Sequence, residues 1–383
     1  RSLKPVLRRC TRARMQTEIA HTSVSNSSED TTGAVYQLDP LVDSRWDRFV
    51  NRSEGASLFH TRAWLEALHR TYGYKTVVFT TSSDGEELKN GIAFCKVESW
   101  LTGRRLVSLP FSDYCQPLVS DKHDLNALMT ALETERHKGA WRYVELRPFD
   151  EIETAKPLYH VSSTYFRHEI DLSPSAGALF KSFHKNSIQR KIRRAAREKL
   201  EYQEGTTDAH LDAFHRLMVQ TRRRHSVPPQ PKIWFRNLLR SFGNDVKIRL
   251  ALKDSRPIAG MLTVRHKDTL VYKYGGSDAK FSPMGGMHLL YWRSMLEAKQ
   301  SGLRTFDLGR CEVGQDGLLV FKKRWGAIET PLHYIRFTDP GNAGEVFEPA
   351  SKSWNARLAK QVFSHAPSPL LSMLGSVLYK HVG

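Results

Sequence analysis

The sequence is poor in cysteine and contains no long apolar run. Its 383 residues include only four cysteines, Cys10, Cys95, Cys115 and Cys311, and their spacing matches neither a zinc site nor a disulfide framework. No stretch approaches the ~20 apolar residues of a membrane-spanning helix, and the N-terminus lacks the apolar core of a secretory signal. We therefore expect no metal site, no transmembrane segment, and a reducing, cytoplasmic compartment.

What the sequence has in excess is positive charge. It holds 58 Lys and Arg against 40 Asp and Glu, which gives a formal net charge of +18. More than half of this excess falls within residues 181–240. A local basic field favours a polyanionic partner, such as cofactor phosphates, tRNA or an anionic membrane surface. A solvated basic face explains the charge equally well.

Length and patterning indicate an α/β protein with two domains. An apolar content of 40% is enough for packed cores. We divide the chain into a disordered, basic and Ser/Thr-rich extension (1–34), a first domain (35–170), a second domain (171–340) and a C-terminal helical tail (341–383).

The two domains share one order of elements. In the first, two strands flank a turn at 83–85, and a helix over 122–138 ends at Gly139 before a strand that carries Glu145. In the second, two strands flank a turn at 253–257, and a helix ends at Gly302 before a strand that carries Asp307. This parallel predicts two copies of one α/β unit related by a pseudo-twofold axis, with mixed, mostly antiparallel sheets flanked by helices.

A basic amphipathic helix is predicted over residues 180–200, where the two domains meet. Its apolar residues share one face and its arginines another, with Asn186 or Ser187 as a possible N-cap. Lys185 and the first N–H groups of the helix would then face one anion. We therefore predict phosphate binding by four side chains: Lys185, Asn186, Arg190 and Arg194.

Four motifs resemble the FemAB-type and CelD-like acyltransferases of the GNAT superfamily. They are SLFHTRAWLEALHRTYGY, HKNSIQRKIRRAAREKL, VYKYGGSD and TFDLGR followed by FKKRWG, in this order over residues 35–340. LVSLPFSDYCQPLV resembles the FemAB-related proteins associated with exosortase and exopolysaccharide systems. The resemblance implies two GNAT-like domains and transfer of an acyl or aminoacyl group to an amine. The usual GNAT phosphate loop and the long coiled-coil arm of tRNA-dependent Fem ligases are both absent.

The predicted catalytic groups lie in the second domain. Lys322 and Arg310 are expected to stabilise charge or anchor phosphate. Tyr272 and Tyr274, two residues apart on one strand, are expected to share a face, with Tyr274 shuttling a proton or positioning the acceptor. Asp307 is read as structural support, paired with its loop or with Arg310. Three residues of the first domain complete the predicted acceptor side: His60, Asp113 and Tyr114.

Two functions remain open at this stage. The first is a bacterial N-acyltransferase that acts on an amino sugar, an amino acid or a cell-envelope precursor in polysaccharide or peptidoglycan biosynthesis. It would hold no tight cofactor and would use acyl-CoA or aminoacyl-tRNA as co-substrate, with a small-molecule or lipid-linked amine as acceptor and a possible peripheral contact with the inner face of the membrane. The second is a non-catalytic protein that binds nucleic acid or an anionic surface through the basic residues 181–200.

Overall fold

The computed structural model describes residues 34–152, 159–338, 375 and 377–381. The predicted extension lies outside these residues except for Ala34, and so does the predicted tail except for six residues. All the described residues lie within the compact unit Gly33–Gly383. Within the described part of the chain, no helix is both long and apolar enough to span a membrane.

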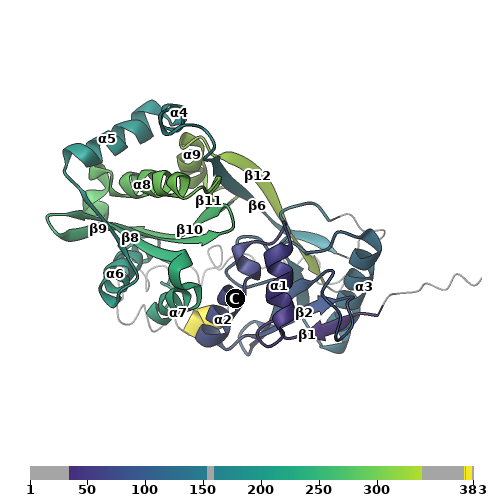
Figure 1. Cartoon of the computed structure of the whole chain (residues 1–383). Coiled ribbons are helices and arrows are strands. Elements are labelled where there is room, and N and C mark those ends of the chain that lie inside the picture. The colour runs from purple at the N-terminus through teal and green to yellow at the C-terminus, as the bar shows by residue number, and fades with distance from the viewer. Residues whose placement is uncertain (1–33, 153–158, 339–374, 376, 382–383) are drawn as a thin grey trace, which may run out of the picture. The chain divides into compact units, whose positions relative to one another are not determined.

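One sheet of twelve strands organises this unit. Its order is β1-β2-β3-β4-β5-β12-β6-β11-β10-β9-β8-β7 (Figure 1). The strands have these bounds: β1 Tyr36–Leu38, β2 Lys75–Thr80, β3 Ile92–Ser99, β4 Gly103–Val107, β5 Tyr143–Leu146, β6 His160–Asp171, β7 Glu201–Gly205, β8 Val246–Lys253, β9 Arg256–His266, β10 Thr269–Ser277, β11 Thr305–Glu312 and β12 Ile328–Phe337.

The strand order reads the same from both edges, so the predicted repeat is confirmed. β1 to β5 of the first repeat correspond to β7 to β11 of the second, and β4–β5 and β10–β11 are the two parallel pairs. The two central strands are exchanged between the repeats. β6 follows the first repeat but pairs with β11, while β12 follows the second repeat but pairs with β5. β6 and β12 pair with each other and join the halves.

Helices cover both faces of the sheet. In the second repeat, α8 packs on one face against the buried side chains of Met261, Leu270 and Phe306, while α6 and α7 pack on the other face (Figure 1). The helices have these bounds: α1 Ser44–Arg52, α2 Arg62–Tyr72, α3 Lys122–Lys138, α4 Ala176–Ser182, α5 Arg190–Arg197, α6 Asp208–Arg224, α7 Lys232–Phe242, α8 Gly286–Gln300 and α9 Asp316–Arg324.

Local signals explain several helix ends. Thr61 caps α2 by accepting a hydrogen bond from the backbone N–H of Trp64, and α3 ends at Gly139, as predicted. The prediction for the basic segment was wrong in its details. A π-helical turn at Lys185–Gln189 precedes α5, and its cap is the ring of His184, which accepts from the backbone N–H of Ser187. Neither Asn186 nor Ser187 is therefore the capping residue.

The close approach of β10 to α6 yields the first prediction. A Cβ atom added at Gly276 would lie 2.7 Å from the backbone carbonyl atoms of Leu217 in α6. Because backbone cannot move as a side chain can, Gly276→Ala should lower the free energy of unfolding by about 1–3 kcal/mol. Chemical denaturation measures this change.

Gly177→Ala is the matched control. Gly177 lies in α4, where an added Cβ meets no atom within 4 Å, so this change should leave stability unaltered or raise it by about 0.5–1 kcal/mol. Equal stabilities for the two variants would contradict the tight contact at Gly276.

Candidate functional site

The site forms where two neighbouring strands separate. β10 and β11 pair in parallel only from Thr269 opposite Thr305 to Val271 opposite Asp307. Beyond that point, β10 pairs with β9 alone and β11 with β6 alone. The backbone groups that follow Val271 and Asp307 therefore lack each other as partners, and side chains from both repeats gather there.

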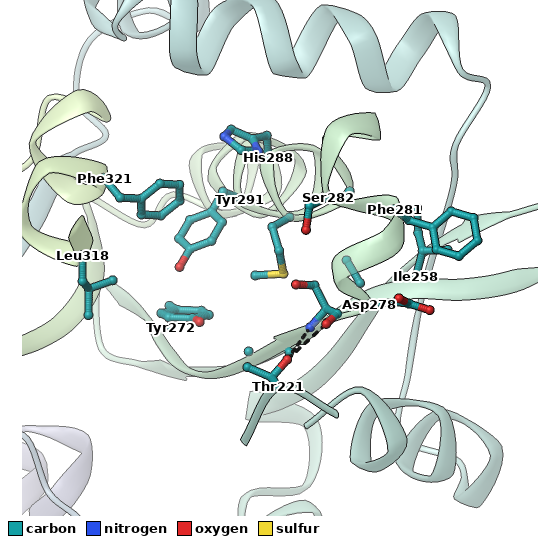
Figure 2. A pocket seen from close by; sticks show the side chains of 16 residues that line it. Thr221, Ile258, Tyr272, Asp278, Phe281, Ser282, His288, Tyr291, Leu318 and Phe321 are labelled. Carbon is teal, nitrogen blue, oxygen red and sulfur yellow. Dashed lines mark hydrogen bonds between the residues drawn. The ribbon is translucent and has the colours of Figure 1, made fainter. Parts of the chain in front are cut away.

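A cavity of about 300 Å³ lies against β10 on the α8 side of the sheet. Figure 2 shows Tyr272, Tyr291 and Phe321 turned toward one another at one end, with Phe281 and Ile258 at the other. The first residues of α8 and one side of α9 complete the wall, which consists mostly of apolar and aromatic side chains with three glycines. Such a lining is typical of a small-molecule site.

The cavity carries little charge. Burial, with the charge of Lys191 second, lowers the pKa of His288 to about 4, so its imidazole is neutral at pH 7. Asp278 accepts a hydrogen bond of 2.9 Å from Arg256, which balances its carboxylate. Burial also raises the pKa of Tyr272, so that its phenol keeps its proton. The lining residues thus offer hydrogen-bonding groups without an unpaired charge.

The predicted pair of tyrosines does not share a face. β10 has a β-bulge between Tyr272 and Tyr274, with Lys273 as the extra residue. A bulge breaks the alternation of side chains, so Tyr272 points to α8 and into the cavity. Tyr274 points to the opposite face, where it accepts a hydrogen bond of 2.9 Å from the indole of Trp234. The predicted common face was wrong because the sequence period conceals the bulge.

A second irregularity sets the position of Arg310. The pairing of β11 with β6 shifts between Asp307 and Arg310, and Gly309 adopts a left-handed φ of +69°. The Arg310 guanidinium lies 4.0 Å from the ring centroid of Tyr165 and donates a hydrogen bond of 2.7 Å to the Tyr334 hydroxyl. Its side chain remains 28% exposed, so the remaining N–H groups can reach a ligand.

Of the two supports predicted for Asp307, the structure shows the contact with its own loop and not the pairing with Arg310. The Asp307 carboxylate is fully buried and accepts from the Tyr114 hydroxyl at 2.7 Å and from the Gly309 N–H at 2.6 Å. Its cationic partner is Arg167 of β6, at 3.4 Å. The bulge at Gly309 directs the Arg310 side chain away from Asp307 and leaves that carboxylate to the central strand. Asp307 is thus part of the support of the site, as expected.

Asp113 of the first repeat reaches into the separation between the strands. Its carboxylate accepts a hydrogen bond of 2.8 Å from Lys273 on β10 and lies 3.9 Å from the Nε of Arg310 on β11. Burial opposes ionisation of Asp113, but the charges of Lys273 and Arg310 outweigh it and lower the pKa of this carboxyl. The Lys273 ammonium is itself buried against the rings of Phe59 and Trp64, and burial lowers its pKa. This ion pair links the repeats.

Lys322 holds the bulge in place. It is 3% exposed, and its ammonium donates to the backbone carbonyls of Gly309, at 2.8 Å, and of Arg310, at 3.1 Å. Lys322 and Arg310 are therefore neighbours, but the contacts of Lys322 face the β11 backbone. Within the described part of the chain, Tyr274 is connected to these two residues through Lys273 and Asp113.

The other predicted site residues lie elsewhere. His60 is 1% exposed, bonded to the Ser57 N–H and the Gln116 carbonyl, and burial lowers its pKa to about 4. It supports a loop and cannot face an acceptor. Four exposed residues of the basic segment do not line the cavity: Lys185, Asn186, Arg190 and Arg194. Arg194 is paired with Glu198.

Sequence reasoning missed Lys273, Arg167, Tyr165, Tyr334 and His288. Lys273 had a usable signal, because it is a charged residue between two tyrosines on an apolar strand. The residues of β6 and β12 had none, since neither strand was predicted.

A group of Asp121, His123 and Asp124 has ligand atoms close enough for a metal ion. Asp121 caps α3 and Asp124 bonds Thr81 and Asn90, so the group is explained by the local structure.

Comparison with known proteins agrees with this geometry. Residues 182–323, which contain the cavity and Arg310, match the family described as acetyltransferase (GNAT) domain. These residues therefore form a GNAT-like domain, which supports the predicted class of transferase. FemX shares the predicted FemAB-like fold. No curated protein matches the sequence.

Solved structures share the fold over most of the chain. FemX is 14% identical, with a TM-score of 0.61 over 78% of this chain and 96% of its own. The C-terminal domain of a putative lysylphosphatidylglycerol synthetase from Agrobacterium fabrum is 14% identical, with a TM-score of 0.51 over 80% and 95%. L-PGS from Bacillus licheniformis is 15% identical, with a TM-score of 0.52 over 85% and 98%. At such identities the likeness establishes the fold alone.

The cavity histidine predicts a pH dependence of stability. The pKa of His288 is about 4 in the folded chain and about 6.5 when unfolded. Because protonation favours the unfolded state, its contribution to stability is present above pH 6.5 and is lost as the pH falls toward 4. His288→Gln should therefore show a smaller loss of unfolding free energy across this range, measured by urea denaturation at several pH values.

His210→Gln is the control for this experiment. His210 is partly exposed and bonded to Thr207 at the start of α6, outside the cavity. Its replacement should leave the acid limb of the profile close to that of the parent protein. A His288→Gln profile parallel to the parent would contradict a neutral imidazole in the cavity.

Proposed function

We propose that this protein transfers an acyl or aminoacyl group from an activated donor, held in the cavity beside Tyr272, to an amine held near Arg310 and Asp113. The observation that carries the proposal is the separation of β10 and β11 immediately after Val271 and Asp307. The cavity lies against β10, while Asp113 and Arg310 meet at the same separation on the other side. A donor carbonyl placed in this gap would be accessible both to the phenol of Tyr272 and to an amine held near Arg310 and Asp113.

Tyr272 is the candidate general acid. Its hydroxyl lies in the cavity, 2.3 Å from where a Cβ of Gly275 would stand, at the end nearest to the separation of the strands. Since its raised pKa keeps the phenol protonated, it can give a proton to the thiolate or alkoxide that leaves when the amine attacks, and the resulting tyrosinate takes up the proton that the amine nitrogen loses. Tyr274, the residue chosen from the sequence, lacks this access.

Arg310 anchors a negatively charged group of the acceptor in this proposal. Tyr165 and Tyr334 hold the guanidinium, and among the described residues only one of its N–H groups has a partner within hydrogen-bond distance. A carboxylate or phosphate can therefore bind to its free edge. Lys322 acts through the backbone, by keeping Gly309 and Arg310 in the bulged conformation.

The neutral cavity suits the uncharged arm of a donor, while phosphates require cations outside it. Arg224 at the end of α6 lies beside the cavity, where it donates to the Ser277 carbonyl, and the basic segment adds Lys185, Arg190 and Arg194. Acyl-CoA and aminoacyl-tRNA both combine a reactive ester or thioester with phosphates. The acceptor is an amine on an amino sugar, an amino acid or a lipid-linked cell-envelope precursor of a bacterium, handled in the cytoplasm or at the inner face of the membrane.

A non-catalytic role is the second candidate. It is favoured by the exposure of Lys185, Asn186 and Arg190, none of which lines the cavity. A nucleic acid could bind to these residues without any reaction, with an affinity that falls as salt rises.

The two tyrosines provide the test of catalysis. Tyr272→Phe should lower kcat by about 10²–10⁴-fold with little change in donor KM, because it removes proton transfer and leaves the ring in place. Tyr274→Phe is the matched control and should keep kcat, at the expense of about 1 kcal/mol of stability from the lost hydrogen bond. The assay measures release of thiol from acyl-CoAs, or of tRNA from aminoacyl-tRNAs, with a panel of amines.

Two results would contradict this assignment. Equal loss of kcat in both variants would show that Tyr272 has no special role. Absence of turnover with every donor and amine, together with RNA binding that Lys185→Gln and Arg190→Gln abolish, would favour the non-catalytic candidate.

Arg310 provides a separate test of the acceptor. Arg310→Gln should raise KM for an amine that bears a carboxylate or phosphate by about 10–150-fold, the effect of losing a charged hydrogen bond of about 1.5–3 kcal/mol. The same amine without its acidic group should show little difference between variant and parent. Arg265→Gln, at an exposed ion pair with Asp245, is the control and should change neither constant. A uniform fall in kcat for both amines would instead assign Arg310 to charge stabilisation during the reaction.

A further inference from the structure

We propose that residues 377–381, near the C-terminal end of the chain, form a strap that positions the acceptor loop, residues 108–114, which leads from β4 to Asp113. The strap is helical and is drawn in yellow in Figure 1. Tyr379 is its positioning residue. The role of Asp113 at the acceptor rests on the proposed function, whereas the contacts of the strap with the loop do not depend on it.

The acceptor loop has a strained backbone. Leu109 has a φ of +55° and Phe111 a φ of +61°, left-handed conformations that are unfavourable for residues with a Cβ atom. Such a backbone persists only where its surroundings hold it. On the inner side, the Arg147 guanidinium donates hydrogen bonds to the carbonyls of Leu109, at 3.0 Å, and Ser112, at 3.3 Å. The Phe111 side chain is left to be held from the outer side.

The strap supplies this outer support through Tyr379. The centroid of its ring lies 5.6 Å from that of Phe111. Phe111 also contacts the rings of Tyr72, at 5.1 Å, and Trp234, at 5.9 Å. The Tyr379 hydroxyl donates a hydrogen bond of 3.0 Å to the carbonyl of Pro228, which precedes α7 in the second repeat. One side chain therefore ties the acceptor loop to the other repeat.

The first repeat fixes the end of the strap. The Tyr74 hydroxyl donates to the carbonyl of Tyr379 at 2.9 Å. The Thr102 hydroxyl, at 2.7 Å, and the Arg105 guanidinium, at 2.6 Å, both donate to the carbonyl of His381. The last carbonyls of a helix have no partner within the helix, so these donors satisfy groups that the strap cannot satisfy itself. The Tyr379 ring is thereby held at a defined position over the loop.

The inner end of the acceptor loop meets the second repeat at Asp113. Its carboxylate accepts from Lys273 and lies 3.9 Å from the Nε of Arg310, while its backbone carbonyl accepts from the Tyr334 hydroxyl at 2.7 Å. Because Tyr334 also accepts a hydrogen bond from Arg310, a shift of the loop would move both groups of the proposed acceptor site. Of the described residues, none in the strap or the loop lines the donor cavity. The strap therefore acts on acceptor binding and not on donor binding.

Hydrogen–deuterium exchange of the full chain tests the contact without any ligand. Tyr379→Ala should speed exchange in the acceptor loop severalfold and leave the cavity segment 272–288 unchanged, because only the loop loses a support. Tyr379→Phe keeps the ring contact and should stay close to the parent. Thr102→Val removes one bond to the strap without touching that ring, and should change the same segment to a smaller extent. Val377→Ala, at a 52% exposed residue of the strap, is the control and should match the parent.

Steady-state kinetics test the consequence. With the donors and amines of the assay above, Tyr379→Ala should raise KM for the acidic amine by about tenfold, because a loop that must be ordered on binding lowers affinity. Both kcat and the donor KM should stay as in the parent, and Tyr379→Phe should restore the parent KM.

Three results would overturn the proposal. They are equal exchange of the acceptor loop in Tyr379→Ala and the parent, faster exchange over all the described elements, and a fall in kcat with an unchanged KM for the amine. The second result would make the strap a support of general stability, and the third would separate it from acceptor binding. If the parent protein shows no turnover with any donor, the proposed function fails, while exchange still decides for or against the contact of the strap with the loop.

Discussion

The exchange of the two central strands is the constraint on which the rest of the structure depends. Each repeat buries a carboxylate at the end of its parallel strand, Glu145 in the first and Asp307 in the second. A buried carboxylate requires a cationic partner, and the exchanged strands supply it. Arg336 of β12 bonds Glu145 at 2.7 Å, and Arg167 of β6 pairs with Asp307. Each repeat therefore takes a cationic partner for its buried carboxylate from the strand that belongs to the other repeat, and Glu145 is also paired with Arg147 of its own repeat.

Residues inserted in two strands of the second repeat, β10 and β11, create the site within this symmetric arrangement. In the first repeat, Arg147 follows Glu145 by two positions and pairs with it. In the second repeat, Gly309 adds one residue to the strand, and the resulting bulge turns Arg310 toward Tyr165 and Tyr334. Where the first repeat has an arginine in a structural ion pair, Arg147, the second repeat has Arg310, whose guanidinium is accessible. On β10 the extra residue Lys273 forms a second bulge, which places Tyr272 and Tyr274 on opposite faces of the sheet.

The sequence predicts what depends on local pattern. Glycines marked the ends of α3 and α8, and the repeated order of elements indicated the pseudo-twofold relation of the two repeats. β6 and β12 were not predicted because most of their side chains are half-buried or exposed, without the alternation that marks a strand. The site residues that lie on them were missed with them. The bulges were also invisible, because register depends on tertiary pairing. His60 shows the converse error, since a polar residue beside a helix start proved to be a buried loop support.

The distribution of charge bears on how donor and acceptor can be told apart. The cavity lining is neutral, because His288 is deprotonated and Asp278 is paired. Arg310, by contrast, is accessible on the far side of the strand separation, and no carboxylate of the described residues lies within hydrogen-bond distance of it. An anionic group therefore gains nothing inside the cavity and gains a charged hydrogen bond at Arg310. In the proposed reaction, this asymmetry would orient the two substrates without any selectivity in shape. The uncharged reactive arm of the donor would enter beside Tyr272, and the acidic amine would approach from the side of the first repeat.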